Sequence, residues 1–228
     1  MRHLLFITGL LFTSFSFSQK AEVMEKLKEY NFSEDLLTEN VKDADALYSF
    51  TQKMTTINSN GATEEISNFD PNKKVGDKWE LVSVNGNSPT KKEKKTFNKN
   101  HNSTKEVNGE LDEHSWKIVS DGDDYLVISF RYDKKTLPKK YAFLGDCIGY
   151  AFFNKATKEL EKSEFKNEGP IKIKVLNVQH LDMVIHYLKD EDGTYLMKTM
   201  NMDLEVYFLG QVVDVKEISE YSDYKKVK

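Results

Sequence analysis

An alternation of apolar and polar residues recurs through the last third of the chain and restricts it to β structure. Leu181, Met183, Ile185 and Tyr187 alternate against Asp182 and His186, residues 171–175 and 204–208 repeat the pattern, and residues 212–218 close the run. Successive side chains of a β-strand point to opposite faces, so this alternation places one face of each strand on a core and the other on solvent. The pattern predicts a run of neighbouring strands.

The rest of the chain carries further strand signals, about ten strands in all. Tyr48 to Thr55 alternates in the same way, and residues 79–84 end at Asn85-Gly86, a dipeptide typical of tight hairpin turns. Short turns favour sequential antiparallel pairing. Ten twisted strands curl into a barrel, a half-barrel or a sandwich. The sequence has no internal repeat, which excludes a propeller or a solenoid.

The first 18 residues are typical of a secretory signal peptide. Arg2 precedes an apolar run from Leu4 to Phe17, about 14 residues long and short of the roughly 20 that a membrane span needs. Ser16-Phe17-Ser18 provides small residues for cleavage before Gln19. The alternative is an uncleaved anchor. No cysteine follows that could accept a lipid, so we expect export to the periplasm or beyond, in soluble form.

Two segments interrupt the β pattern. Residues 19–46 carry apolar side chains at helical spacing and form the predicted N-terminal helical segment. Residues 88–114 form a predicted Lys-rich helical insertion, which begins with a possible capping box from Thr90 to Glu93. The predicted organisation is therefore a signal peptide (1–18), a helical segment (19–46) and one β domain (47–228) that contains the insertion.

The charge balance excludes some partners. The chain has 33 Lys and Arg against 37 Asp and Glu, and loss of Arg2 with the first 18 residues leaves 32 against 37, a net charge of −5. This mild acidity gives no reason to expect nucleic acid or an anionic membrane surface as partner. With no second long apolar segment, we do not expect an integral membrane protein.

The sequence contains no catalytic or cofactor-binding motif, and we predict no enzyme activity, no metal and no cofactor. Cys147 lies in an apolar segment and is interpreted as a core residue. His180, Asp182 and His186 share strand parity, but the two imidazoles are about 20 Å apart along a strand, too far for one metal ion. The acidic segments 121–124 and 190–193 are interpreted as hairpin turns. A hydrolase without a recognisable motif is the remaining enzymatic alternative.

Aromatic residues make up 12% of the chain, and the late strands are rich in methionine. On the inside of a curled sheet such side chains would line an apolar cavity suited to an acyl chain, or else fill a solid core. The predicted cavity-lining residues come from four of the predicted strands. They are Trp79, Leu81, Leu126, Ile128, Phe130, Met183, Ile185, Leu204 and Val206.

Several short segments resemble periplasmic lipoprotein carriers of the outer-membrane lipoprotein-sorting type. The matching segments are Phe50-Thr51-Gln52-Lys53, Phe143-Leu144-Gly145, Lys158-Glu159-Leu160 and Tyr221-Ser222-Asp223-Tyr224-Lys225. This resemblance implies a mainly β (α+β) fold, an unclosed antiparallel half-barrel with N-terminal helices packed on it, and binding of acyl chains.

Other segments resemble different groups. Residues 70–97, with Trp79-Glu80-Leu81 and Gly86-Asn87-Ser88-Pro89-Thr90, are similar to uncharacterised exported bacterial proteins. Trp79-Glu80-Leu81 also resembles lipocalin-like domains, which makes a closed lipocalin-like barrel the alternative fold. The leading hypothesis is an exported, non-enzymatic protein that binds a lipid or a lipidated protein. The alternative is an envelope scaffold or interaction module without a small ligand.

Overall fold

The computed structural model describes residues 19–32, 47–101, 109–139, 141–173, 176–208 and 210–227. The predicted signal peptide, the second half of the predicted helical segment and residues 102–108 lie outside these ranges. Within the described ranges, residues 19–29 form a helix, called helix 19–29 below. No helix of the described residues is long and apolar enough to cross a membrane.

The described chain is built around a single antiparallel sheet of eleven strands. After helix 19–29, its elements follow in the order β1 (Tyr48–Asn58), β2 (Gly61–Phe69), β3 (Trp79–Val84), α3 (Lys91–His101), β4 (Lys117–Asp121), β5 (Tyr125–Phe130), the 3₁₀ helix η2 (Ala142–Asp146), β6 (Cys147–Asn154), β7 (Glu159–Asn167), β8 (Ile171–Ile173), β9 (Leu176–Lys189), β10 (Tyr195–Phe208) and β11 (Gln211–Lys226).

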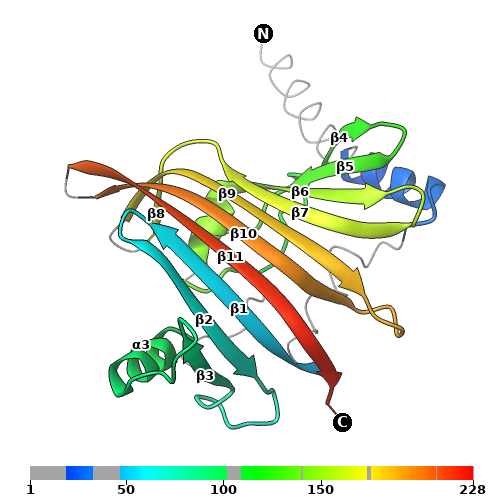
Figure 1. Cartoon of the computed structure of the whole chain (residues 1–228). Coiled ribbons are helices and arrows are strands. Elements are labelled where there is room, and N and C mark those ends of the chain that lie inside the picture. The colour runs from blue at the N-terminus through cyan, green and yellow to red at the C-terminus, as the bar shows by residue number, and fades with distance from the viewer. Residues whose placement is uncertain are drawn as a thin grey trace.

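The strand order in the sheet is β3-β2-β1-β11-β10-β9-β7-β6-β5-β4, with β8 paired to β9 beside this path. Neighbours in the sheet are neighbours in sequence except at two places, where β1 pairs with β11 and where β7 pairs with β9 past β8. The edge strands β3 and β4 are joined through α3 but do not pair with each other, so the sheet stays open (Figure 1). The predicted curled, unclosed antiparallel sheet is thereby confirmed, and the closed lipocalin-like barrel is wrong.

The two helices pack at opposite ends of the sheet, helix 19–29 beside β4–β6 and α3 beside β3 (Figure 1). Val23 and Leu27 of helix 19–29 are fully buried in the main core, and Phe32 packs on Phe153 of β6 with ring centroids 5.1 Å apart. Phe97 of α3 is buried against Trp79 of β3. We call the face that carries both helices the inner face, and the opposite one the outer face.

Local sequence explains how the elements end. Asn85 and Gly86 both adopt positive φ, 49° and 74°, which a two-residue hairpin turn requires and which these residue types tolerate best. The capping box of α3 forms as predicted, since the Thr90 backbone N–H donates to Glu93 at 2.6 Å and the Glu93 N–H donates to the Thr90 hydroxyl at 3.3 Å.

The apolar run of residues 141–153 predicts one long strand, and this prediction is wrong in part. Ala142–Asp146 forms the 3₁₀ helix η2, and the strand begins only at Cys147. A Cβ at Gly145 would lie 2.5 Å from the Cβ of Lys134, so this glycine permits a close approach of two chain segments rather than a strand bend.

Candidate ligand-binding face

The inner face holds two apolar clusters with a more exposed region between them. The main cluster gathers β5, β6, β7, β9 and helix 19–29, and includes Leu126, Ile128 and Phe153, all with no exposed surface. The second cluster centres on Phe50, Phe69 and Tyr221, with Trp79 packed against it. Met200 of β10 packs against both clusters, so β10 and β11 form the region that joins them.

All nine predicted cavity-lining residues lie on the inner face, because the register aligns them with one another across the strands. Their burial differs. Leu81, Leu126, Ile128, Phe130, Met183 and Val206 are buried, whereas Trp79, Ile185 and Leu204 are partly exposed. The first group is packed into the sheet's own cores, and the second group marks where a ligand would have room. Their role in lining a cavity stays a prediction.

Four partly exposed apolar side chains form a short strip on β10 and β11. Met200, Met202 and Leu204 lie on β10, and Val215 of β11 is opposite Leu204. On one side of the strip β9 presents the buried Leu181, 0% exposed, opposite Leu204, and on the other side β1 presents the partly exposed Met54 and Thr56. Methionine fills irregular spaces and adapts to different apolar surfaces, so this strip suits a flexible apolar ligand.

A polar trio lies beside this strip. Gln52 of β1, Ser67 of β2 and Ser219 of β11 are all buried. The Gln52 side-chain amide donates to the Ser219 hydroxyl at 3.2 Å and to the Tyr221 hydroxyl at 3.3 Å, and the Ser67 hydroxyl is 3.5 Å from the Gln52 carbonyl oxygen. These mutual hydrogen bonds satisfy polar groups that would otherwise be costly to bury.

Two glutamates complete this region of the inner face. Glu65 of β2 is opposite Met54 of β1, and Glu217 of β11 is opposite Thr56 of the same strand. Burial, and then the charge of Glu93, raises the pKa of Glu65. Burial, and then the charge of Glu65, raises the pKa of Glu217. Both carboxyls are thus held in surroundings that disfavour their ionised forms.

These five polar residues are absent from the sequence-based set. The alternation of β1, β2 and β11 does assign each of them to an inner position, because they share parity with Phe50, Phe69 or Tyr221. The missing information was the pairing of β1 with β11, which brings the first and last strands together and cannot be read from short-range patterns.

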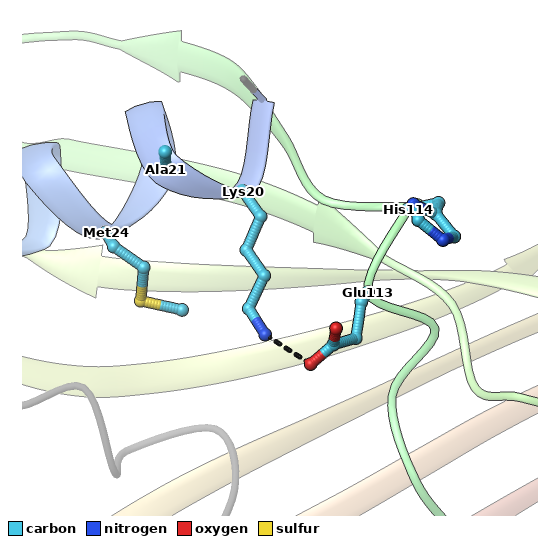
Figure 2. A pocket seen from close by; sticks show the side chains of 5 residues that line it. All are labelled: Lys20, Ala21, Met24, Glu113 and His114. Carbon is cyan, nitrogen blue, oxygen red and sulfur yellow. Dashed lines mark hydrogen bonds and ion pairs between the residues drawn. The ribbon is translucent and has the colours of Figure 1, made fainter. Parts of the chain in front are cut away.

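A pocket of about 250 Å³ lies at the first turn of helix 19–29 (Figure 2). It is lined by Lys20, Ala21, Met24, Glu113 and His114, and the Lys20 ammonium forms an ion pair with Glu113 at 2.7 Å. Pockets for drug-sized ligands start at about 300 Å³, so this one is small for an acyl chain. It marks the boundary of helix 19–29 against the loop that precedes β4.

The outer face carries charged side chains that form ion pairs with one another. Glu164 of β7 forms ion pairs with Lys162 at 2.7 Å and Lys166 at 3.0 Å, and Lys166 also reaches Asp182 of β9 at 3.5 Å. His180 and His186 lie on this same side of β9, with Asp182 between them. No group of three or more potential metal-ligating side chains occurs among the described residues.

Cys147, the first residue of β6, is completely buried, as predicted. Burial raises the pKa of its thiol to about 11, and the nearby charge of Asp146 adds to the effect. A buried thiol that stays protonated is a poor nucleophile, which fits a packing role.

The fold and face define an open antiparallel sheet with helices on its inner side. The solved structures that resemble it include a LolA superfamily protein from Nitrosomonas europaea, with 9% identity, a TM-score of 0.38, and 83% of this chain and 91% of that chain covered. A putative outer membrane lipoprotein-sorting protein domain from Vibrio parahaemolyticus is also similar, with 11% identity, a TM-score of 0.37, and 92% and 93% covered. No protein-family model and no curated protein matches the sequence.

Proposed function

We propose that this protein is a non-enzymatic binding protein that holds an acyl chain, of a lipid or of a lipidated protein, on the inner face of its sheet. The observation that carries the proposal is the partly exposed strip of Met200, Met202, Leu204 and Val215 between two buried clusters. Exposed apolar area on a sheet face is costly in water, and covering it with an alkyl chain gains about 25 cal/mol for each Å² removed from solvent.

The signal peptide of residues 1–18 is part of this proposal, as is a location in the periplasm or outside the cell. In that setting a carrier must bind a chain and release it again. A strip that is only partly exposed, on strands anchored by two cores, provides a preformed surface for such reversible binding.

The test is binding of a neutral apolar fluorophore, N-phenyl-1-naphthylamine, followed by its displacement with dodecanol and with a palmitoylated peptide. We expect saturable binding and displacement by both competitors. Met202→Asp places a charge in the strip and should weaken binding at least about tenfold, because an ionised carboxylate must then be covered. Val212→Asp is the matched control, since Val212 lies on the same hairpin but is exposed.

Two results would contradict the proposal. One is the absence of saturable fluorophore binding to the purified protein. The other is an equal loss of affinity in Met202→Asp and Val212→Asp, which would place the bound fluorophore outside the strip. Native mass spectrometry of protein purified from its own host adds a direct readout, because a bound lipid appears as a mass increment that denaturation removes.

A second candidate function is an interaction module without a small ligand, and α3 is the observation that favours it. Its lysines are all exposed. They are Lys91, Lys92, Lys94, Lys95 and Lys99. A basic helix surface fits an acidic protein partner. Replacing Lys91, Lys92 and Lys95 by Glu should abolish capture of that partner and leave thermal stability unchanged; unchanged capture would rule this function out.

A further inference from the structure

The centre of the inner face, which we call the central patch, contains twelve residues on four adjacent strands. They are Gln52, Met54 and Thr56 of β1; Thr63, Glu65 and Ser67 of β2; Met200, Met202 and Leu204 of β10; and Val215, Glu217 and Ser219 of β11. Two of the twelve carry charge, both are carboxyls, and none is basic. In the described part of the chain, neither carboxyl has an ion pair or a side-chain hydrogen bond.

No positive charge is found among the described groups that face the two carboxyls. Glu65 is flanked by Met54 of β1 and Val84 of β3, and the charge that acts on it from α3 is that of Glu93. Glu217 is flanked by Thr56 of β1 and Met202 of β10, and the charge that acts on it is that of Glu65. Every charge in this set is therefore negative, and the flanking side chains are neutral.

We propose that the inner face takes up protons on Glu65 and Glu217 when an apolar chain covers the central patch, so that binding tightens as the pH falls. The inference rests on the proposed function and specifies its regulation. Water still reaches both partly exposed carboxyls in the free protein. An alkyl chain over Met202 displaces that water, and an unpaired carboxylate in an apolar setting avoids the cost by accepting a proton.

The direction and size of the effect follow from linkage. A group that is protonated in the bound state and ionised in the free state makes the Kd rise with pH, by up to about tenfold per pH unit for each proton taken up. The dependence is confined to the interval between the pKa of the free protein and the higher pKa of the complex. Below that interval both states are protonated, and the Kd is constant.

Proton uptake by the two carboxyls also provides a way to release the bound chain. Protein that holds a chain tightly where the carboxyls are neutral would release it where they ionise, without movement of the sheet. Glu93 of α3 also disfavours the ionised form of Glu65. The hydrogen bonds from Thr90 lower the pKa of Glu93, which therefore stays ionised beside Glu65.

The test measures the Kd of N-phenyl-1-naphthylamine, which carries no group that titrates between about pH 4.5 and pH 8.5, across that range. For the unmodified protein we expect a Kd about tenfold or more higher at the alkaline end than at the acid end. Glu65→Gln with Glu217→Gln should give a flat profile near the low-pH Kd. Each single substitution should remove part of the dependence. The control, Glu64→Gln with Glu220→Gln, changes the outer face of the same two strands and should keep the full profile.

The outcomes separate this inference from the proposed function. Binding that does not change with pH in the unmodified protein overturns the inference and leaves the proposed function standing. So does a pH dependence that persists unchanged in the Glu65→Gln, Glu217→Gln protein. Absence of binding at every pH overturns the proposed function and the inference with it. The single variants guard against misfolding of the double variant, since each tests one carboxyl separately.

Discussion

Glu65 on β2 and Glu217 on β11 lie on the same face of the sheet with only strand β1 between them, and the charge of Glu65 raises the pKa of Glu217. The two residues are 152 positions apart in the sequence. The pairing of β1 with both β2 and β11 brings them together. When both carboxyls are ionised, the repulsion between their negative charges in this partly buried setting lowers the stability of the folded protein.

The first prediction concerns stability and pH. Because the folded-state pKa of Glu217 is raised above its ordinary value of 4.5, its ionisation costs more in the folded than in the unfolded state. This cost is absent below about pH 4.5 and fully present above the folded pKa. Glu217→Gln should therefore stabilise the protein near pH 8, and the gain should vanish as the pH falls toward 4.

Chemical denaturation at several pH values measures this gain. Glu220→Gln is the control, because Glu220 lies on the same strand but is exposed on the outer face, opposite Lys53. Glu220→Gln should not give the gain in stability near pH 8 that is expected for Glu217→Gln. An equal gain at pH 4 and pH 8 for Glu217→Gln would mean that packing of the amide, and not relief of charge, is responsible.

Side-chain parity was the part of the fold that the sequence predicted best. The assignment of Leu181, Met183 and Ile185 to one face was correct, since all three contribute to the main cluster. Hairpins were also predictable, because turn residues such as Asn85-Gly86 act locally. These successes share a cause: alternation and turn chemistry depend on residues close together in the chain.

The parts of the fold and of the site that the sequence did not predict depend on long-range contacts. The pairing of β1 with β11 has no local signal, and the buried trio of Gln52, Ser67 and Ser219 exists only through it. The 3₁₀ helix η2 was missed because its apolar content resembles that of a buried strand. The close approach of Gly145 to Lys134, eleven positions away, is not visible in that pattern. Polar residues at inner positions were the one signal that could have indicated the site.

The second prediction tests the docking of helix 19–29. Leu27 is 1% exposed and belongs to the main cluster, so Leu27→Ala should destabilise the protein by about 2–4 kcal/mol through lost apolar burial and a cavity. Denaturant titration measures the change. Glu25→Ala, on the exposed side of the same helix, should change stability by less than about 0.5 kcal/mol. Equal effects of both substitutions would contradict a packing role for Leu27, because alanine is the best helix former and neither change lowers helix propensity.

The third prediction concerns α3. Phe97 is the buried residue of this helix, packed on Trp79 with ring centroids 6.4 Å apart. Phe97→Ala should detach α3, seen as faster amide hydrogen exchange within Lys91–His101 and unchanged protection in β5–β7. Thr96→Ala alters the exposed neighbour and should leave exchange in α3 unaffected. Global loss of protection in Phe97→Ala would show that α3 is part of the main folding unit.

The fourth prediction uses two glycines without unusual backbone angles. A Cβ at Gly149 of β6 would lie 2.6 Å from Cζ of Phe130 and 3.0 Å from Cε1 of Phe165, whereas a Cβ at Gly169 would meet nothing within 4 Å. Gly149→Ala should cost about 1–3 kcal/mol of unfolding free energy through overpacking. Gly169→Ala should be neutral or slightly stabilising. A neutral Gly149→Ala would mean that the Phe130 ring moves aside freely.

The last prediction concerns the thiol of Cys147. With no exposed surface and a pKa raised to about 11, it should react with Ellman's reagent near pH 8 at least about 100-fold more slowly than free cysteine. In guanidinium chloride the same thiol should react at the rate of an ordinary cysteine, and Cys147→Ala should give no signal in either condition. Because reaction requires opening of the main core, the labelling rate of the native protein should rise in Leu27→Ala by the factor that corresponds to its loss of stability. Rapid labelling of the native protein would instead place Cys147 in contact with solvent and argue against its role as a packing residue between η2 and the start of β6.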